Sequence, residues 1–310
     1  MKKYTIGVIY GGISAERKVS LASGKNLAKI LKNNFKVKLY DTKDDLAKLF
    51  SDCYLKKIDL AYPILHGTAG EDGSLQGFLE MLKIPYLGSG VLGSALGIDK
   101  LIQRNILAHN KITVPLYFVI KKSEKIKPAI YQFCQKNKCL VKPNTQGSSI
   151  GVSICQIGRE LKKGVRIAAK YDQTILVEKY LLGRELTVGV WGDENPKALP
   201  PIEIIPKEDF FNFQAKYSSE TREIVPAQIP AKVSQKVQDL AVLVYRILRS
   251  SGICRVDMIW DDKKNQIYIL EINTIPGMTE NSLIPKAIKA AGFDINQFFT
   301  RLILEKIDHA

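Results

Sequence analysis

The sequence feature that most constrains the fold is a pair of apolar segments near the carboxyl end, separated by five polar residues. Residues 252–260 and 266–272 are rich in Ile, Val and Met, whereas residues 261–265 read DDKKN. Two apolar runs joined by a short polar cluster are typical of an antiparallel β-hairpin. We therefore expect this part of the chain to form two paired strands.

The register of this hairpin decides which polar side chains meet. A turn centred on Lys264 places Asp257 opposite Glu271 and Arg255 opposite Asn273. Because side chains alternate between the two faces of a strand, these four polar groups share one face. The other face is apolar and is expected to be buried; it comprises Val256, Met258, Leu270 and Ile272. A slip of one residue would separate the polar groups.

Two carboxylates close together on one face repel each other unless a cation lies between them. Oxygen ligands suit a hard ion such as Mg²⁺, which usually shares its coordination shell with substrate phosphates. The hairpin therefore predicts a metal site at Asp257, Glu271 and Asn273. The alternative is an edge hairpin with a solvated, charged face.

The first hundred residues alternate between strand and helix signals. The predicted strands are residues 4–10, 36–40 and 58–65, and the predicted helices are residues 21–31 and 74–83. Strands separated by helices imply a doubly wound parallel sheet, with ligands at the carboxyl ends of its strands. The glycine-bearing loops 11–17 and 66–73 lie at such ends, so we expect them to be neighbours in space.

The rest of the chain is predicted to be mixed α+β structure. We expect a connection over residues 88–97, a helix over 99–110, and a polar stretch over 206–226 whose length is typical of functional or disordered loops. Further predicted strands are 116–120, 139–142, 152–154, 174–179, 185–191 and 198–204, and further helices are 128–135, 159–170, 232–249 and two at the carboxyl end.

Charge and cysteine content limit the class of protein. The formal net charge of +15 raises the question of nucleic-acid binding. However, 36 of the 46 basic residues are scattered lysines without a recognition-helix signature, which favours a lysine-rich surface. Five dispersed cysteines argue against a disulfide framework and fit a reducing cytoplasm. Neither a signal peptide nor a membrane span is evident, so we expect a cytoplasmic protein that binds neither nucleic acid nor membrane.

A Gly- and Ser-rich loop follows the strand predicted at residues 139–142. Residues 142–151 read KPNTQGSSIG. Small residues let a loop approach phosphates closely, and Lys142 supplies a positive charge. The loop is not a P-loop, because no Gly-Lys-Ser/Thr sequence opens a helix. Taken alone, an ordinary hairpin loop explains it equally well.

Four motifs together resolve this ambiguity. They are GGISAERKVS at residues 11–20, HGTAGEDG at 66–73, KPNTQGSSIG at 142–151 and EINTIPGMT at 271–279. In this order they resemble the motifs of the D-alanine–D-alanine ligase family, within the ATP-grasp superfamily, and the resemblance covers residues 4–304. It implies a pre-ATP-grasp α/β domain (1–97), then an ATP-grasp fold with a central α+β part (98–180) and a carboxyl-terminal part (181–310).

The resemblance implies ATP-dependent ligation of two D-alanines for peptidoglycan precursors, by a homodimer that uses two Mg²⁺ (or Mn²⁺) ions. The first carboxylate attacks the γ-phosphate to give an acyl phosphate and ADP, and the amine of the second D-alanine then displaces phosphate. A D-alanine–D-lactate ligase is a less favoured alternative, because Tyr217 matches a loop tyrosine that favours the amine acceptor. The Glu16 and His66 loops disfavour another ATP-grasp carboxylate–amine ligase.

The resemblance also assigns the substrate site. Glu16 matches the acid that holds the ammonium of the first D-alanine, with His66 nearby. Arg255 and the Gly277 N–H match the oxyanion donors, and Ser282 with the Leu283 amide matches the site for the second carboxylate. The full implied set for substrate binding and catalysis is Glu16, Val19, His66, Ser148, Arg255, Gly277, Ser282, Leu283, Lys216 and Tyr217.

For the nucleotide, Lys100 and Lys142 match phosphate-binding lysines, and Glu185 matches the acid on the ribose. Residues 178–181 match the hinge that reads the adenine edge, and Phe210 with Leu270 would enclose the ring. The implied set is Lys100, Lys142, Ser148, Ser149, Gly151, Glu178, Lys179, Tyr180, Leu181, Glu185, Phe210, Lys216, Leu270 and Asn273.

The resemblance gives the hairpin and the polar stretch their roles. Asp257, Glu271 and Asn273 would hold the metal ions, with Glu271 bridging them. The stretch 206–226 would be a mobile loop that closes over the bound substrates. Its Tyr217 would join Glu16 and Ser148 in a hydrogen-bonded trio.

Overall fold

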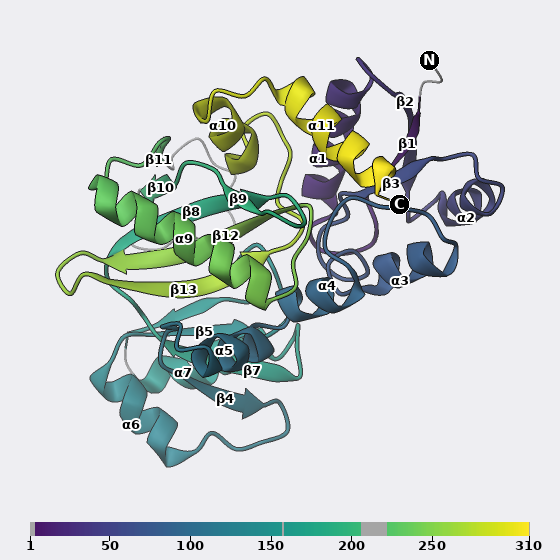
Figure 1. The fold of residues 1–310 in the computed structure, drawn as a ribbon. Coiled ribbons are helices and arrows are strands. Elements are labelled where there is room, and N and C mark those ends of the chain that lie inside the picture. Colours follow the sequence, from purple (N-terminus) through teal and green to yellow (C-terminus); the bar gives the residue numbers. More distant parts are fainter. Residues whose placement is uncertain (1–3, 157, 206–221, 310) are drawn as a thin grey trace.

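The computed structural model describes residues 4–156, 158–205 and 222–309, and the strands in this part of the chain form three sheets (Figure 1). The first sheet is parallel, as predicted, with β1 between β2 and β3. Its elements are β1 (Thr5–Tyr10), α1 (Arg17–Leu31), β2 (Lys36–Asp41), α2 (Leu46–Tyr54), β3 (Leu60–Pro63) and α3 (Ser74–Met81), of which only α2 was not predicted. Ile6 and Val8 enter one core and Ile9 another, so both faces of β1 are buried.

The two glycine-bearing loops of this sheet are neighbours, which confirms the prediction from strand order. Because β1 pairs with β3, the loops that follow these strands leave the same edge of the sheet. The Ser14 hydroxyl donates to the carbonyl of His66 at 2.7 Å. Gly67 has a left-handed φ of 78°, and a Cβ there would lie 3.0 Å from the Glu16 carboxylate. These contacts between the two loops place Glu16 beside the loop that contains His66.

The central sheet is antiparallel, in the order β4-β7-β5-β6. Its strands are β4 (Tyr117–Lys121), β5 (Cys139–Pro143), β6 (Ser153–Cys155) and β7 (Thr174–Lys179), and the helices packed on it are α6 (Pro128–Lys136) and α7 (Gly158–Ala168). The predicted strand–loop–strand unit is confirmed, since β5 and β6 pair across the Gly- and Ser-rich loop.

The segment before the central sheet is more ordered than the simple connection predicted at residues 88–97. It forms α4 (Val91–Ile98), and α5 (Lys100–His109) follows after a break at Asp99. The Asp99 side chain caps α5 by accepting from the Ile102 N–H at 2.9 Å. Because α4 consists of apolar and small residues, it has no polar face through which helical spacing could reveal it.

The third sheet carries the hairpin. Its path is β11-β10-β8-β12-β13, and β9 pairs with β8. The strands are β8 (Arg184–Trp191), β9 (Lys197–Ala198), β10 (Ile202–Ile205), β11 (Arg222–Ile224), β12 (Ile253–Asp261) and β13 (Gln266–Asn273), and helix α9 (Ala231–Ile247) packs on the sheet.

Two features of this sheet differ from the prediction. The strand predicted at 198–204 is divided into β9 and β10, because the intervening Pro200 and Pro201 have no N–H to donate to a ladder. The end of the stretch predicted as a loop over 206–226 forms β11, which pairs with β10. Residues 206–221, with Phe210, Lys216 and Tyr217, lie outside the described residues.

The hairpin has the predicted register at its functional end. Arg255 pairs with Asn273 and Asp257 with Glu271. Beyond this point the register shifts, so that Met258 pairs with Ile269 and Leu270 is the extra residue of a bulge. The expectation that Leu270 joins the buried apolar layer is therefore wrong: Ile269 takes that place with no solvent exposure, and Leu270 lines a cavity. This bulge agrees with the separate assignment of Leu270 to the nucleotide site.

The closing helices return the chain to the first sheet. Helix α11 (Ile295–Asp308) follows α10 (Leu283–Ala290) and lies beside α1 (Figure 1). Phe299 and Ile303 of α11 share one buried core with Ile6 and Leu27. The predicted carboxyl-terminal part thus supplies more than half of the buried residues of a core that also supports the first sheet.

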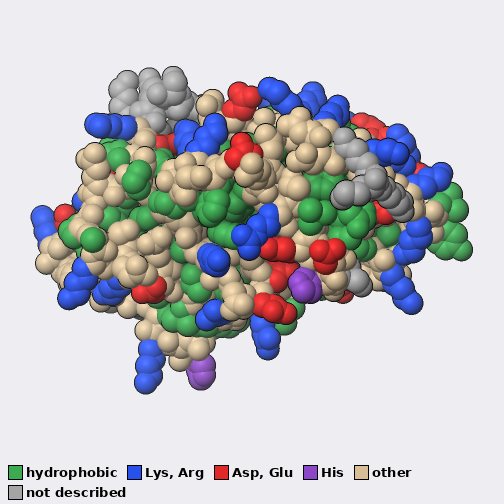
Figure 2. Space-filling view, turned by 45° about the horizontal axis from the view of Figure 1, so that its top comes forward, with side chains coloured by type: hydrophobic (Ala, Val, Ile, Leu, Met, Phe, Trp, Pro, Cys, Tyr) green, Lys and Arg blue, Asp and Glu red, His purple; other side chains and the backbone are tan. Residues whose placement is uncertain are grey.

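The surface carries its excess charge in a dispersed form. Figure 2 shows Lys and Arg side chains spread over the visible face, with acidic side chains collected near its centre. This distribution matches the expected lysine-rich surface. Among the described residues, no helix is long and apolar enough to cross a membrane. All five cysteines are buried free thiols.

Candidate active site

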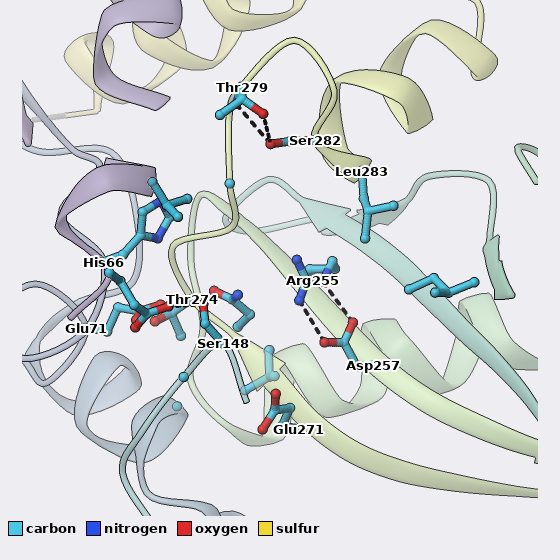
Figure 3. A pocket seen from close by; sticks show the side chains of 18 of the residues that line it. His66, Glu71, Ser148, Arg255, Asp257, Glu271, Thr274, Thr279, Ser282 and Leu283 are labelled. Atoms are coloured by element: carbon cyan, nitrogen blue, oxygen red, sulfur yellow. Dashed lines mark hydrogen bonds and ion pairs between the residues drawn. The ribbon is translucent and has the colours of Figure 1, made fainter. Parts of the chain in front are cut away.

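Two adjoining cavities lie between the loops of the first sheet and the two antiparallel sheets; their linings share six residues, including Lys100, Asp257 and Glu271. The first cavity, of about 650 Å³, is lined by Glu16, Val19, His66, Ser148, Arg255, Asp257, Glu271, Asn273, Gly277, Ser282 and Leu283, which are residues predicted for substrate and metal (Figure 3). The second, of about 420 Å³, is lined by the predicted nucleotide residues Lys100, Lys142, Ser149, Glu178, Lys179, Tyr180, Leu181, Glu185 and Leu270. Of the described residues predicted for the site, Gly151 alone lines neither cavity.

Glu16 connects two loops from different sheets. It precedes α1 and is only 7% exposed. Its carboxylate accepts a hydrogen bond from the Ser148 hydroxyl, in the loop between β5 and β6. Two members of the predicted trio therefore meet, and the third, Tyr217, lies outside the described residues.

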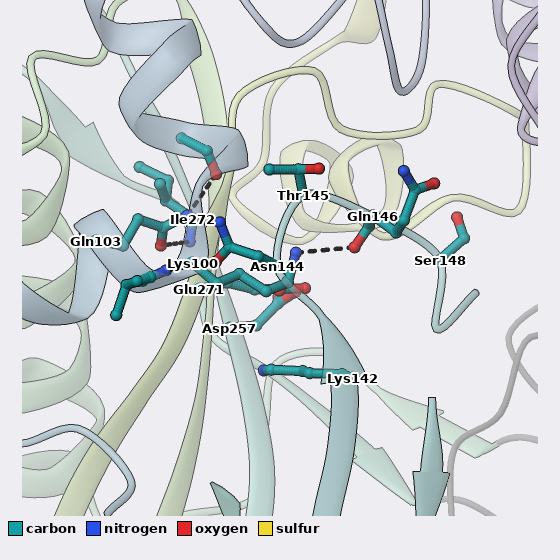
Figure 4. A network of polar contacts seen from close by, with 12 residues as sticks. Lys100, Gln103, Lys142, Asn144, Thr145, Gln146, Ser148, Asp257, Glu271 and Ile272 are labelled. Carbon is teal, nitrogen blue, oxygen red and sulfur yellow. Dashed lines mark hydrogen bonds and ion pairs between the residues drawn. The ribbon is translucent and has the colours of Figure 1, made fainter. Parts of the chain in front are cut away.

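The Gly- and Ser-rich loop has a strained backbone at this contact. Ser148 and Ser149 have φ values of 48° and 58°, in the left-handed region that side chains other than glycine rarely adopt. Each such residue costs roughly 1 kcal/mol or more, and such strain persists where the surrounding structure enforces it. The carbonyl of Gln146 in this loop accepts from Lys100 Nζ at 2.8 Å, so the loop is tied to α5 (Figure 4).

The polar face of the hairpin carries two paired carboxylates. Arg255 donates from Nε and Nη2 to the two oxygens of Asp257, at 2.8 Å each (Figure 3). The Thr187 hydroxyl, from the neighbouring strand β8, donates to Asp257 Oδ1 at 2.6 Å. Glu271 Oε2 lies 3.3 Å from Lys100 Nζ. Each carboxylate thus has a cation beside it, and both face the cavities.

The far end of the first cavity is formed by the start of α10. Ser282 is the residue before this helix, and its Oγ accepts from the Thr279 N–H at 2.9 Å. Gly277 leaves room here, because a Cβ would lie 3.0 Å from Ser282 Oγ. The first N–H groups of a helix have no partner within the helix and favour an anion. The Leu283 N–H is therefore well placed to bind a carboxylate.

Comparison with known proteins decides which family has this arrangement. Models described as the carboxyl-terminal and amino-terminal parts of D-Ala–D-Ala ligase match residues 106–304 and 40–89. The chain belongs to the D-alanine–D-alanine ligase family. The D-alanine–D-alanine ligase of Syntrophobacter fumaroxidans is 42% identical over 308 residues, which cover 97% of each chain.

Solved ligases of this family have the same fold. The enzyme from Coxiella burnetii superposes with a TM-score of 0.85 at 27% identity and covers 100% of this chain and 95% of its own. The Bacillus anthracis D-alanine–D-alanine ligase complexed with ATP superposes with a TM-score of 0.82 at 33% identity and covers 99% and 98%. The mixed fold, with a parallel amino-terminal sheet followed by an ATP-grasp unit, is confirmed by these similarities.

The hairpin of this ligase offers a suitable but incomplete donor set for Mg²⁺ or Mn²⁺. Asp257, Glu271 and Asn273 present oxygen atoms on one face, as hard divalent ions require. Within the described residues no group of three acidic, His or Cys side chains could hold a metal ion. Phosphate oxygens and water would have to complete the shell, which is the usual arrangement for Mg²⁺. The residues present therefore fit the ions that the resemblance implies.

Sequence reasoning missed two residues at or beside the site of the ligase. Glu71 stands in the HGTAGEDG motif but received no role; it lines the first cavity and accepts from the Gly67 N–H at 2.8 Å. Burial raises the pKa of Glu71, and the nearby Glu16 raises it further. Gln103, on α5, accepts from the Ile272 N–H at 3.1 Å, between two of the proposed metal ligands. Glu71 could have been found from its motif, whereas a Gln in a helix carries no such signal.

His66 allows a pH-dependent prediction for the ligase. Burial lowers the pKa of His66 from 6.5 to about 4, although a hydrogen bond with the backbone of Ile275 opposes the shift. The unfolded chain binds a proton below pH 6.5 while the folded chain does not, so stability falls as the pH drops from 6.5 to about 4. A shift of this size corresponds to up to about 3 kcal/mol.

His66→Gln should remove this loss. We expect the difference in unfolding free energy between wild type and variant to change by up to about 3 kcal/mol between pH 7 and pH 4, in urea unfolding. Other titrating groups cancel in this difference. If the two proteins lose stability in parallel, His66 is not the neutral buried group that the geometry indicates.

Proposed function

We propose that this chain joins two D-alanines into D-alanyl-D-alanine for peptidoglycan precursors, through a D-alanyl phosphate, with release of ADP and phosphate. The observation that carries this proposal is the junction of the two cavities at Lys100, Asp257 and Glu271. An amino acid in the first cavity and a triphosphate in the second would meet there.

The residues around the junction suit the first step, the attack of a carboxylate on phosphorus. Glu16 would hold the ammonium of the first D-alanine and so direct its carboxylate toward the junction. Lys100 and Lys142 would offset the repulsion between the two anions. Bound Mg²⁺ would supply charge neutralisation at the phosphates and would be held by Asp257 and Glu271.

The second step needs donors for an oxyanion and a place for the acceptor. Arg255 and the Gly277 N–H lie on the lining of the first cavity, as that role requires. Ser282 and the Leu283 N–H would bind the carboxylate of the second D-alanine at the start of α10. The acceptor amine would then face the carbon that carries the phosphate.

Product analysis tests the proposal. With ATP, D-alanine and Mg²⁺, we expect ADP, phosphate and D-alanyl-D-alanine in equal amounts, and no ADP release without D-alanine. Formation of AMP and pyrophosphate would contradict the acyl-phosphate route. A product formed from D-lactate in preference to a second D-alanine would instead favour the depsipeptide alternative.

We also propose that the protein is a cytoplasmic homodimer. The outer side of α2 carries Leu46, Phe50 and Tyr54 at helical spacing, each about half exposed or more, and Met81 of α3 is 86% exposed. Phe50 and Tyr54 stack with ring centroids 6.0 Å apart. A contiguous apolar surface favours association, and a two-fold axis would let it cover itself. Sedimentation equilibrium should give twice the 34.7 kDa chain mass; the mass of one chain would contradict the dimer.

A further inference from the structure

Three charged side chains form a buried row beside the nucleotide cavity. Arg104, on α5, is 1% exposed; Glu178, on β7, is 2% exposed; Lys142, on β5, is 7% exposed. Arg104 Nε donates to Glu178 Oε1 at 2.6 Å, and Nη2 lies against the same oxygen. Lys142 Nζ lies 3.0 Å from the other oxygen, Glu178 Oε2. One carboxylate is therefore shared by two cations.

The position of Arg104 excludes direct contact with the nucleotide. Lys142 and Glu178 line the nucleotide cavity, whereas Arg104 lines neither cavity. Its guanidinium lies over the ring of Tyr117, 5.9 Å from the centroid, and its Nη1 is 3.5 Å from the carbonyl oxygen of Ile269. Arg104 is thus enclosed behind Glu178, so it can affect bound ATP only through its charge and through the side chains of Glu178 and Lys142, and not by contact.

The charges of Arg104, Glu178 and Lys142 contribute to the electrostatic field that a phosphate meets in the nucleotide cavity. Lys142 and Glu178 alone would form a neutral pair, because each would compensate the other. With Arg104 the row carries a net charge of +1, and in a poorly hydrated site that difference is felt more strongly than in water. Burial alone would raise the pKa of Glu178, but Arg104 and Lys142 together hold it below its ordinary value, so the carboxylate is ionised.

We propose that Arg104 is a positioning residue that compensates Glu178 and so leaves the positive charge of Lys142 available to the phosphates of ATP. This proposal rests on one part of the proposed function, namely that Lys142 binds the phosphates of ATP. Glu178 then serves to orient two cations, since it holds Lys142 on the lining of the nucleotide cavity without neutralising it.

Arg104→Gln tests the first consequence. The variant keeps a side chain that can donate to Glu178 but leaves the row neutral. We expect the Kd of a non-hydrolysable ATP analogue with Mg²⁺, measured by calorimetry, to rise at least about 10-fold, which is about 1.4 kcal/mol. The Kd of adenosine, which has no phosphate, should stay within about twofold of wild type, and KM should rise for ATP but not for D-alanine.

A charge-matched double variant separates this role from a structural one. Arg104→Gln combined with Glu178→Gln restores a net charge of +1 on Lys142, so the ratio of the affinity for the ATP analogue to the affinity for adenosine should return to within about threefold of wild type. Taking this ratio removes any effect that Glu178→Gln has on the adenine hinge. Arg104→Lys, which keeps the charge, should resemble wild type. If Arg104 only supported the fold, the double variant would bind no better than the single one, and adenosine affinity would fall in parallel; either result would overturn the proposal.

The test remains decisive if Arg104→Gln alone does not fold. In that case the single variant Glu178→Gln, in which the three side chains carry a net charge of +2, is compared with the double variant, in which they carry +1. The ATP analogue should bind more tightly to Glu178→Gln than to the double variant, whereas adenosine should bind both equally. Equal affinity for the ATP analogue would reject the proposal. These readouts need no D-alanine, so a failure of the proposed ligation would leave them interpretable.

Discussion

Glu271→Gln should lower kcat at least about 100-fold, a loss of about 2.7 kcal/mol in transition-state stabilisation. Glu271 lines both cavities and lies opposite Asp257 in the hairpin, where it would bridge the two cations of the proposed metal site. Glutamine has nearly the same size but lacks the charge, so metal affinity and activity should fall while the shape of the site is kept. The ion pair with Lys100 would also be lost.

The measurement is steady-state ADP release over a range of Mg²⁺ concentrations, with thermal unfolding as a check on the fold. Glu305→Gln is the matched control, because Glu305 pairs with Arg301 on the exposed side of α11. The control should keep wild-type kcat. Both variants should unfold near the wild-type temperature. A kcat for Glu271→Gln within about threefold of wild type would remove Glu271 from the proposed metal site.

The hairpin shows how far local sequence can predict a site. The alternation of side chains and a turn centred on Lys264 predicted that Asp257 lies opposite Glu271 and Arg255 opposite Asn273, and the structure has these pairs. Next to the turn, however, Asp261 pairs with Gln266, so the connection is one residue shorter than expected, and the bulge at Leu270 restores the predicted pairs. The bulge at Leu270 could not be predicted in the same way. Ile269 and Leu270 are both apolar, so the pattern is the same whichever of them enters the core.

Contacts between distant parts of the chain were harder to predict. The motifs placed Glu16 and Ser148 in one site, but only through the family resemblance, since 132 positions separate them. The packing of α11 on α1 has no local signal, because an amphipathic helix does not specify which surface covers it. Arg104 is similar: a single arginine in a helix is usually solvated, and only tertiary structure shows that Glu178 faces it.

Arg255 both holds Asp257 in the hairpin and would take part in the proposed reaction. The second large loss of activity is therefore expected when Arg255 is replaced. Arg255→Lys should lower kcat by about 100- to 1,000-fold, or about 3–4 kcal/mol. Lysine keeps the charge but not the planar fork that bonds both oxygens of Asp257 at 2.8 Å. The variant would lose donors for the proposed oxyanion and the constraint on Asp257 together.

The pattern of kinetic constants distinguishes this role from a general disturbance. Arg255 lines the substrate cavity but not the nucleotide cavity, so KM for ATP should change little. Because the proposed oxyanion forms after the acyl phosphate, slowing that step gives water time to compete, and the ratio of ADP to dipeptide should rise above one. Arg301→Lys, in an exposed pair on α11, is the matched control and should behave as wild type. If the ratio of ADP to dipeptide stays at one and kcat is unchanged, Arg255 supports the structure of the hairpin and does not take part in the reaction. An arginine that only holds Asp257 would not affect how the acyl phosphate is divided between water and the second amine.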